Sequence, residues 1–403
     1  MSQKQTHKKI IKMNKKQTLK KIKKYNAIFM LCFNNPTYVI GSCISSTIHK
    51  LYINKFKLNI KLVIMCDDVI YNEYKDILNY YFDRVILISL IKFDINNNWA
   101  YVTDKYSSWI QYSCSKWECL KYEEYNKILF VDVDILPNSL KFYELFNYNT
   151  PSIHIDPSYP NLYTYTRYCK NNTAILDEHI SILKKDISYE EYILKHADNI
   201  PLNGGLVLFT PSKNLYLNYK KFIKNIYING IYSSKYTGPD ETSLLYYFIK
   251  TYKNIYHICN NFLIIPWHNK DIKYKPHSYN YTSFIKPWEK PYFLSSNEEH
   301  IWIDIYSKMN KNKKLNDLFF KLLLNSIINY NNKPLLKKKF NFKYLKKYKI
   351  NIKKIKTVKD ILFYNKLNKN KENKQKKLYG NLKVDKIILD FINKINKNNK
   401  NIV

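Results

Sequence analysis

Glycine, arginine and long apolar segments are scarce in this chain. The scarcity of each limits the structures or functions that the chain can have. Six of the 403 residues are glycine, whereas ordinary usage of about 7% would give roughly 28, so each glycine marks a position where a side chain is disfavoured. Arg84 and Arg167 are the only arginines, although proteins that recognise nucleic acids rely on arginine for bidentate contacts. No apolar run reaches the roughly 18 residues of a membrane span. The sequence therefore argues against nucleic acid as the primary partner and against a membrane span.

Paired cysteines and a secretory signal are also missing. The seven cysteines are scattered and form no Cys-x-x-Cys pair, which favours reduced, buried thiols in a cytosolic type of compartment. The basic N-terminus leads into the apolar run from Ile28 to Phe33, which is too short for the core of a signal peptide. We therefore expect a cytoplasmic protein.

Positive charge is abundant, but it lies at the two ends of the chain. The net charge is +35, from 67 Lys and Arg against 32 Asp and Glu. Residues 1 to 24 hold ten lysines and no acid, and residues 331 to 403 hold 23 lysines and four acids, so residues 25 to 330 carry only +6. We predict a mobile basic tail over 1–24, one α/β domain over 25–310, and a Lys- and Asn-rich appendage over 311–403 that is helical or partly disordered.

The start of the chain alternates between strand and helix patterns. Apolar runs of strand length cover Ala27 to Phe33, Lys61 to Cys66 and Arg84 to Leu90, and helical patterns over Thr37 to Tyr52 and Tyr71 to Tyr81 separate them. This order predicts a parallel, doubly wound sheet with helices on both faces. Such sheets bind ligands at the carboxyl ends of their strands.

The stretch from Lys127 to Pro137 combines an apolar run with two carboxylates. We expect one strand that carries Asp132 and Asp134 on one side and Val133 on the other, because successive strand residues alternate between faces. Two neighbouring carboxylates on an apolar strand need a positive partner, and a hard divalent cation with oxygen ligands is the usual one. The sequence thus predicts a metal site at the end of this strand.

Three further motifs have structural as well as functional explanations. Asn203-Gly204-Gly205 precedes an apolar strand, where glycine allows a ligand to approach the backbone or simply makes a bulge. Asp240 and Glu241 fall in the first turn of a predicted helix, where capping alone would explain them. Lys286 stands next to a rigid Pro-Trp pair and is suited to hold an anionic group.

Taken in chain order, these motifs resemble the glycogenin-like family of retaining glycosyltransferases, family 8 with the GT-A fold. The resemblance runs from about Ala27 to Trp288, with gaps in the loops. Its details are most similar to a poorly characterised branch that includes insect-virus proteins, which would place the protein in the cytoplasm of an infected host cell. The motifs that carry it are Leu31, Asn34 and Tyr38 in and after the first strand, Ser115-Lys116 in a predicted helix from Ser113 to Tyr125, Phe130-Val131-Asp132-Val133-Asp134, Asn203-Gly204-Gly205, Asp240-Glu241 and Lys286-Pro287-Trp288.

The resemblance implies an α/β, Rossmann-like GT-A domain with a mostly parallel sheet flanked by helices, here with basic N- and C-terminal extensions. It also implies a metal-dependent hexosyltransferase that moves a glucose-type hexose from a UDP-sugar to an acceptor, which could be a protein tyrosine, a glycan or a small molecule. Asp132 and Asp134 would hold Mn²⁺ or Mg²⁺, and Asp240 and Asn203 would take part in catalysis. The residues implied in donor binding are Leu31, Tyr38, Lys116, Val133, Gly204, Gly205, Glu241 and Lys286.

The sequence departs from the family's pattern at several positions. The family's third metal ligand is a histidine where this chain has Asn280, and His277 is a nearby substitute. Glu241 replaces a glutamine that faces the sugar, and Thr237 replaces an acid. These departures leave a second interpretation open, in which the chain is a degenerate transferase that acts as a binding or scaffold protein.

The Asp-x-Asp motif is also typical of aspartate-nucleophile phosphatases. Those enzymes carry it on their first strand, followed by a serine or threonine, whereas here it follows three predicted strands and Ile135 stands at the threonine position. A phosphatase is therefore disfavoured.

Overall fold

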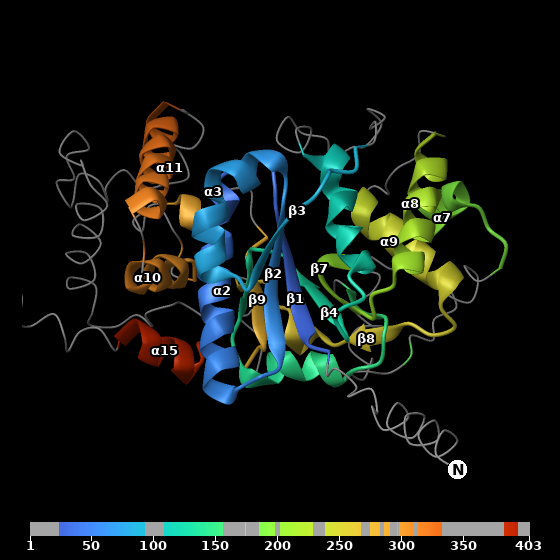
Figure 1. Cartoon of the computed structure of the whole chain (residues 1–403), viewed down its shortest axis with the longest axis horizontal. Helices are drawn as coiled ribbons and strands as arrows, with labels where there is room; N and C mark the ends of the chain where they lie inside the picture. Colours follow the sequence, from blue (N-terminus) through green and yellow to red (C-terminus); the bar gives the residue numbers. More distant parts are fainter. Residues whose placement is uncertain are drawn as a thin grey trace, which may run out of the picture.

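A central sheet with helices on both sides makes up the core of the protein (Figure 1). The computed structural model describes residues 24–92, 109–155, 174, 185–197, 202–228, 238–266, 275–282, 286–290, 296, 298–309, 311, 313–332 and 383–393. Most of the predicted basic tail and Thr237 lie outside these residues.

The central sheet has seven strands in the order β3-β2-β1-β4-β7-β6-β8. β7 runs antiparallel to its neighbours β4 and β6, and the other paired strands are parallel. This confirms the predicted α/β fold with a mostly parallel sheet flanked by helices. The strands are β1 (Asn26–Cys32), β2 (Ile60–Cys66), β3 (Arg84–Leu87), β4 (Ile128–Val131), β6 (Ser152–Ile155), β7 (Leu202–Phe209) and β8 (Tyr256–Ile258).

The start of the chain forms the predicted unit of β1, α2 (Thr37–Phe56), β2, α3 (Asp68–Tyr81) and β3. α3 begins earlier than its apolar pattern indicated, because the Asp67 side chain accepts a hydrogen bond from the Ile70 backbone N–H (2.9 Å) and caps the helix. The same carboxylate accepts a hydrogen bond from the Asn34 N–H (2.8 Å). Asp67 therefore ties the turn after β1 to the end of β2.

The Asp-Val-Asp motif lies in a turn between two strands, so the prediction of one continuous strand was wrong. β4 ends just before the motif, and the next strand, β5 (Ile135–Pro137), pairs antiparallel with β9 (Ser278–Asn280) in a separate two-stranded sheet. The Ile135 backbone N–H donates to the Asp132 carbonyl (3.0 Å) and closes the turn. The directions of Asp132 and Asp134 are therefore set by this turn and not by strand alternation.

β7 brings its glycines to the same edge of the sheet as the Asp-Val-Asp turn. Because β7 runs antiparallel to β4, its first residues lie beside the last residues of β4, with Leu206 opposite Val131. The Asp132 backbone N–H donates to the Gly205 carbonyl (3.0 Å) and extends this pairing into the turn. Gly204 and Gly205 thus lie inside a strand and not before it.

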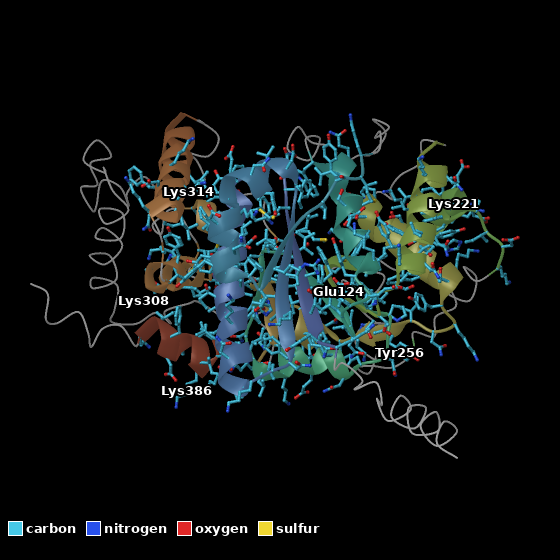
Figure 2. All side chains as sticks on the ribbon, viewed as in Figure 1. Glu124, Lys221, Tyr256, Lys308, Lys314 and Lys386 are labelled. Atoms are coloured by element: carbon cyan, nitrogen blue, oxygen red, sulfur yellow. The ribbon has the colours of Figure 1, made fainter. Side chains whose placement is uncertain are left out.

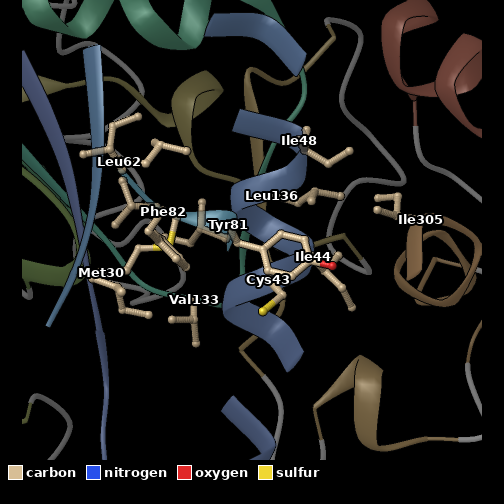
Figure 3. Close-up of a cluster of buried hydrophobic side chains, with 14 of the residues drawn as sticks. Met30, Cys43, Ile44, Ile48, Leu62, Tyr81, Phe82, Val133, Leu136 and Ile305 are labelled. Carbon is tan, nitrogen blue, oxygen red and sulfur yellow. The ribbon is translucent and has the colours of Figure 1, made fainter. Parts of the chain in front are cut away.

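Two hydrophobic clusters cover the two faces of the sheet. One face packs against α2, α3 and α10 (His300–Lys308), and Figure 3 shows part of this cluster. The other face packs against a 3₁₀-helix, η1, and against α7, α8 and α9, which lie to the right of the sheet in Figure 1. The bounds of the remaining helices are η1 (Ile110–Lys121), η2 (Leu140–Asn147), α7 (Tyr189–Lys195), α8 (Lys213–Ile228), α9 (Pro239–Thr251), η5 (Asn260–Phe262) and η7 (Pro287–Glu289).

Two helices beyond residue 310 pack onto this domain. α11 (Lys313–Asn332) contacts α2, and α15 (Lys386–Asn393) contacts α2 and α10. Ile388 and Ile392 of α15 are buried in the cluster around α2, whereas Lys386 is exposed (Figure 2). No helix in the described ranges is long and apolar enough to cross a membrane. The described part of the predicted appendage is therefore packed against the core.

A hydrogen-bonded clip joins the segment before α15 to β5 and β9. Asn138 follows β5, and its Nδ2 donates to the carbonyls of Pro276 (3.0 Å) and Lys383 (2.9 Å). Its Oδ1 accepts a hydrogen bond from the Asp385 N–H (2.9 Å), and the Asp385 carboxylate pairs with Lys275 (2.6 Å). Asn138 is 1% exposed, so these hydrogen bonds are shielded from water. The clip helps to fix the strand pair that flanks the Asp-Val-Asp turn.

The packing of α15 predicts that this helix contributes to the stability of the whole domain. Ile388→Ala is expected to lower the free energy of unfolding by about 2–5 kcal/mol, because it removes a fully buried side chain from the cluster around α2. Lys386→Ala on the same helix is the control, since Lys386 is exposed. Urea denaturation measures both changes, and equal stabilities of the two variants would contradict the prediction.

Candidate active site

Lys116 joins three elements at the carboxyl edge of the sheet. It projects from η1, and its Nζ lies 2.7 Å from Asp240 Oδ2 at the start of α9 and 3.8 Å from Asp132 Oδ1 after β4. The indole N–H of the next residue, Trp117, donates to the Asp240 carbonyl (2.9 Å) and fixes η1 against α9. Burial opposes the charged form of Lys116, but the carboxylates of Asp132, Asp240 and Glu241 raise its pKa above the ordinary value. Lys116 therefore remains an ammonium ion.

Lys286 pairs with the second carboxylate of the turn. Its Nζ lies 2.5 Å from Asp134 Oδ2, and the two side chains are 13% and 11% exposed. The Lys286 backbone N–H donates to Glu289 Oε2 (2.8 Å), which closes the first turn of η7. The neighbouring Trp288 is fully buried and packs edge-on against the ring of Tyr38. Burial raises the pKa of Tyr38 to about 12; the Lys286 charge opposes this rise, and the Asp134 charge adds to it.

Glu241 caps its own helix and reaches β7 at the same time. Its Oε1 accepts a hydrogen bond from the Gly204 N–H (2.7 Å), and its Oε2 accepts one from the Gly238 N–H (3.0 Å). Burial and the neighbouring Asp240 charge raise the pKa of Glu241 to about 8, although Lys116 and the two N–H groups favour the ionised form. The capping explanation therefore holds for Glu241, whereas the Asp240 side chain turns to Lys116.

The two adjacent glycines leave space that these carboxylates fill. A Cβ on Gly204 would lie 2.8 Å from Glu241 Cγ and 3.2 Å from Asp240 Oδ2. A Cβ on Gly205 would lie 2.9 Å from Asp132 Oδ2 and 3.0 Å from the side-chain oxygen of Asn203. The side-chain oxygen of Asn203 also accepts a hydrogen bond from the Gly205 N–H (2.9 Å). Glycine is thus required for three carboxylates to converge on one stretch of β7.

The cluster carries more negative than positive charge. Asp132, Asp134, Asp240 and Glu241 contribute four carboxylates, and Lys116 and Lys286 contribute two ammonium groups, which leaves two negative charges when all six are ionised. Desolvation, with the charges of Asp134 and Asp240, raises the pKa of Asp132 to about 6 even though 40% of its side chain is exposed. An additional positive charge beside Asp132 would lower this pKa.

Asn280 supplies a third oxygen beside the turn. Its Oδ1 is buried and has no hydrogen-bond partner among the residues that the structure describes, which is costly for an amide oxygen. Asn280 pairs with Ile135 across β5 and β9, so the two side chains share one face of that sheet. The Cδ1 atom of Ile135 would lie 3.1 Å from a Cβ on Gly205, beside Asp132. The Asn280 side chain therefore lies on the face of β5 and β9 that meets the carboxylate cluster.

The donor set fits a hard divalent cation. Two carboxylates and an amide oxygen are the oxygen ligands that Mg²⁺, Mn²⁺ and Ca²⁺ accept, and the excess negative charge matches one such ion. No group of three His, Cys, Asp or Glu side chains in the described ranges is arranged to hold a metal, so the Asn280 oxygen is needed to complete the set. His277 is already engaged: its Nδ1 lies 2.9 Å from Ser139 Oγ and its Nε2 lies 3.3 Å from Asn261 Nδ2.

Two of the predicted donor-binding residues lie outside the polar cluster. Leu31, at the end of β1, packs in the hydrophobic cluster on the η1 face of the sheet. Val133 packs in the cluster on the α2 face, beside Met30 and Cys43 (Figure 3). Their roles in donor binding remain predictions.

The sequence did not point to two residues that support the site. Trp117 lies in the predicted helix from Ser113 to Tyr125, and its N–H holds the backbone of Asp240. Gly41 lies in α2, and a Cβ there would lie only 2.5 Å from a ring atom of Trp288. The scarcity of glycine was the available signal for Gly41, since glycine within a helix is otherwise unfavourable.

Gly205→Ala is expected to weaken binding of Mn²⁺ without unfolding the protein. The added methyl group meets the ends of the Asp132 and Asn203 side chains, which can rotate away, so stability changes little while Asp132 loses its position. Displacing one ligand in this way is expected to reduce metal affinity about tenfold or more. Calorimetric titration with Mn²⁺, beside a thermal melt of the same sample, measures both quantities. Unchanged Mn²⁺ affinity in a folded variant would contradict the prediction.

The raised pKa of Glu241 predicts how stability depends on pH. The pKa of about 8 lies above the ordinary 4.5, so the folded state binds this proton more tightly than the unfolded chain. Between these two values the contribution of Glu241 to the free energy of unfolding therefore falls as pH rises. Burial lowers the pKa of His49, His154 and His257, which has the opposite effect below pH 6.5, so the Glu241 contribution is measured as a difference between variants. We expect the melting temperature of the metal-free wild-type protein, relative to that of Glu241→Gln, to decrease from about pH 5 to about pH 8. Glu191→Gln, which removes the exposed partner of Lys195, is the control, and an identical slope in both variants would contradict the assignment.

Comparison with known proteins gives structural neighbours only. No family model and no curated protein matches the chain. A crystal structure of the galactosyltransferase LgtC in complex with donor and acceptor sugar analogs is 12% identical and covers 72% of this chain and 99% of its own, with a TM-score of 0.44. An active-site mutant of LgtC is also 12% identical, covering 71% of this chain and 97% of its own with a TM-score of 0.45.

A third neighbour is mouse xyloside xylosyltransferase 1 in its apo form. It is 10% identical and covers 64% of this chain and 97% of its own, with a TM-score of 0.36. The first and third neighbours are named as a galactosyltransferase and a xylosyltransferase, the second is a mutant of the first, and none is named as a viral protein. The predicted relation to an insect-virus branch therefore has no support among them.

Proposed function

We propose that the chain is a retaining glycosyltransferase of the GT-A type, which moves a hexose from a UDP-sugar to an acceptor that is a protein tyrosine, a glycan or a small molecule. The observation that carries this proposal is that two carboxylates of one turn, Asp132 and Asp134, each pair with a lysine that is only 13% exposed at one edge of the sheet. The Tyr281 N–H donates to the Asp134 carbonyl (3.0 Å), and the preceding residue is Asn280, whose buried side-chain oxygen has no hydrogen-bond partner in the described ranges. Oxygen ligands next to ammonium groups suit a substrate that carries a diphosphate, whose charge needs neutralising on several sides.

The residues divide into a diphosphate side and a sugar side. Asp132, Asp134 and Asn280 would hold Mn²⁺ or Mg²⁺, which when bound neutralises the charge that develops on the leaving diphosphate. Lys286 supplies a positive charge on the same side. On the sugar side, Asp240 presents its carboxylate at Gly204, where it would act as the nucleophile or stabilise an oxocarbenium ion.

Lys116 and Glu241 act as positioning groups in this proposal. Lys116 lies between Asp132 and Asp240 and holds both carboxylates in place. Glu241 is held by two backbone N–H groups, so it fixes Gly204 against the start of α9. Asn203 and the glycine backbone would frame the sugar.

A hydrolysis assay tests this function. Purified protein with Mn²⁺ and either UDP-glucose or UDP-galactose is expected to release UDP, and Asp134→Asn is expected to abolish the release. Asp83→Asn is the control, because Asp83 also pairs with a lysine, Lys61, but lies away from the site. If the wild-type protein neither turns over nor binds a UDP-sugar, the scaffold interpretation holds instead. Full activity in Asp134→Asn would refute the metal assignment.

A further inference from the structure

Lys286 pairs with one of the carboxylates proposed to bind the cation. Its Nζ lies 2.5 Å from Asp134 Oδ2, and both side chains are nearly buried. We propose that Lys286 is a built-in counter-ion of the metal site: it holds Asp134 until a divalent cation displaces it, and the released ammonium group then binds the diphosphate. The cation therefore binds before the nucleotide. This inference rests on the proposed function, since it concerns the same carboxylates.

The two lysines of the site are not equivalent in this respect. Lys116 lies closer to Asp240 (2.7 Å) than to Asp132 (3.8 Å), so it can keep its main partner when a cation binds. Lys286 has Asp134 as its direct partner. Of the two carboxylates proposed to bind the cation, Asp134 is thus the one that forms a close ion pair with a lysine.

The backbone of Lys286 is anchored while its side chain is long. Its N–H donates to the Glu289 side chain (2.8 Å), and the ring of Trp288, two residues further on, is fully buried beside Gly41. A lysine side chain has four rotatable carbon bonds. The ammonium group can therefore leave Asp134 by rotation of the side chain alone, without movement of η7.

Electrostatic repulsion explains why the Lys286 ammonium group and a divalent cation do not bind Asp134 together. An ammonium group and a divalent cation on the same carboxylate repel strongly where water is scarce. A buried carboxylate without a partner would destabilise the metal-free protein, and the ion pair with Lys286 avoids this at Asp134. Once a cation takes over this role, the ammonium group needs a new anion, and a diphosphate beside the cation supplies one.

Direct binding of Mn²⁺ in the absence of nucleotide tests the proposal. Lys286→Met removes the competitor and is expected to tighten Mn²⁺ binding roughly tenfold, a usual size for coupling between two bound groups. Lys286→Arg keeps the charge and is expected to bind Mn²⁺ no more tightly than the wild type. Lys290→Met is the matched control, because it breaks a lysine–carboxylate pair of the same 2.5 Å length, with Glu299, outside the carboxylate cluster. The free Mn²⁺ signal in electron paramagnetic resonance measures all three.

A second measurement follows the released ammonium group. With Mn²⁺ saturating, Lys286→Met is expected to bind UDP about tenfold more weakly than the wild type in calorimetric titrations. If Lys286→Met does not fold, Lys286→Gln takes its place, since its amide can still donate a hydrogen bond to Asp134.

The outcomes separate this inference from the function on which it rests. Tighter Mn²⁺ binding with weaker UDP binding supports the exchange. Unchanged or weaker Mn²⁺ binding in the neutral variants, while the wild type binds Mn²⁺, overturns the exchange and leaves the metal site intact. Absence of Mn²⁺ binding in the wild type and in every variant, with and without UDP, overturns both the exchange and the metal-dependent function.

Discussion

Asp240→Asn is expected to reduce kcat for UDP-sugar hydrolysis by roughly 10³-fold, the usual cost of removing one group that stabilises the transition state. The substitution keeps the size of the side chain but removes the negative charge that faces the space at Gly204. UDP affinity should change less than kcat, because Asp134 and Lys286 pair with each other and Asp240 is linked to the diphosphate side through Lys116. Steady-state kinetics and calorimetric titration with UDP measure the two effects separately.

Glu118→Gln provides the matched comparison for Asp240→Asn. Glu118 is a buried carboxylate on η1 that pairs with Lys121 and accepts a hydrogen bond from Tyr216, away from the carboxylate cluster. We expect it to lower stability without lowering kcat. A similar kcat in Asp240→Asn and the wild type would remove Asp240 from the catalytic group.

Gly41→Ala is expected to destabilise the protein by about 2–3 kcal/mol through overpacking. Alanine normally stabilises a helix by about 1 kcal/mol relative to glycine, so the sign of the change is diagnostic. In α2 the new methyl group would lie 2.5 to 2.7 Å from three ring atoms of Trp288, which is fully buried and cannot swing into solvent. Chemical denaturation measures the change.

A double-mutant cycle isolates this contact. Trp288→Leu removes the ring that the alanine meets, so Gly41→Ala in the Trp288→Leu background should be neutral or stabilising. Equal effects of Gly41→Ala in both backgrounds would mean that the helix, and not the tryptophan, requires glycine at this position.

Local pattern was sufficient to predict the first half of the sheet. β1 and β2 each contain seven residues, all apolar except Asn26 and Lys61, and α3 after β2 has an amphipathic pattern. A parallel strand buried on both faces has such a composition, so the strand, helix and sheet assignments follow from the residues themselves. The α/β fold with its flanking helices was therefore predictable from sequence.

The break between β4 and β5 was not predictable in the same way. Ile128 to Leu136 looks like one apolar strand interrupted by two acids, and only the pairing of Ile135 with Asn280 turns the chain out of the main sheet. That partner is far away in the sequence, and a local pattern carries no information about it. A related case is α15: a helical appendage was predicted, but the local pattern carries no information that Ile388 and Ile392 pack in the cluster around α2.

The candidate site was found from sequence residue by residue, but not as a network. The sequence indicated Asp132, Asp134 and Asp240. It could not show that Lys116 lies between Asp132 and Asp240, or that Lys286 forms an ion pair with Asp134. Such pairings depend on how η1, α9 and η7 meet at the edge of the sheet. The additional capping role of Glu241 shows how one side chain can satisfy a local rule and a long-range contact together.

The clip at Asn138 has a consequence for the order in which the chain folds. The side chain of Asn138 bonds to residues 245 and 247 positions further along. Contacts of such long sequence separation form late, because a large loop must close first. During synthesis on the ribosome, β5 and the adjoining Asp-Val-Asp turn would therefore reach their final arrangement only after β9, and then Lys383 to Asp385, have been synthesised. The residues that would bind the cation are thus among the last to be organised, after the parallel strands behind them have already paired.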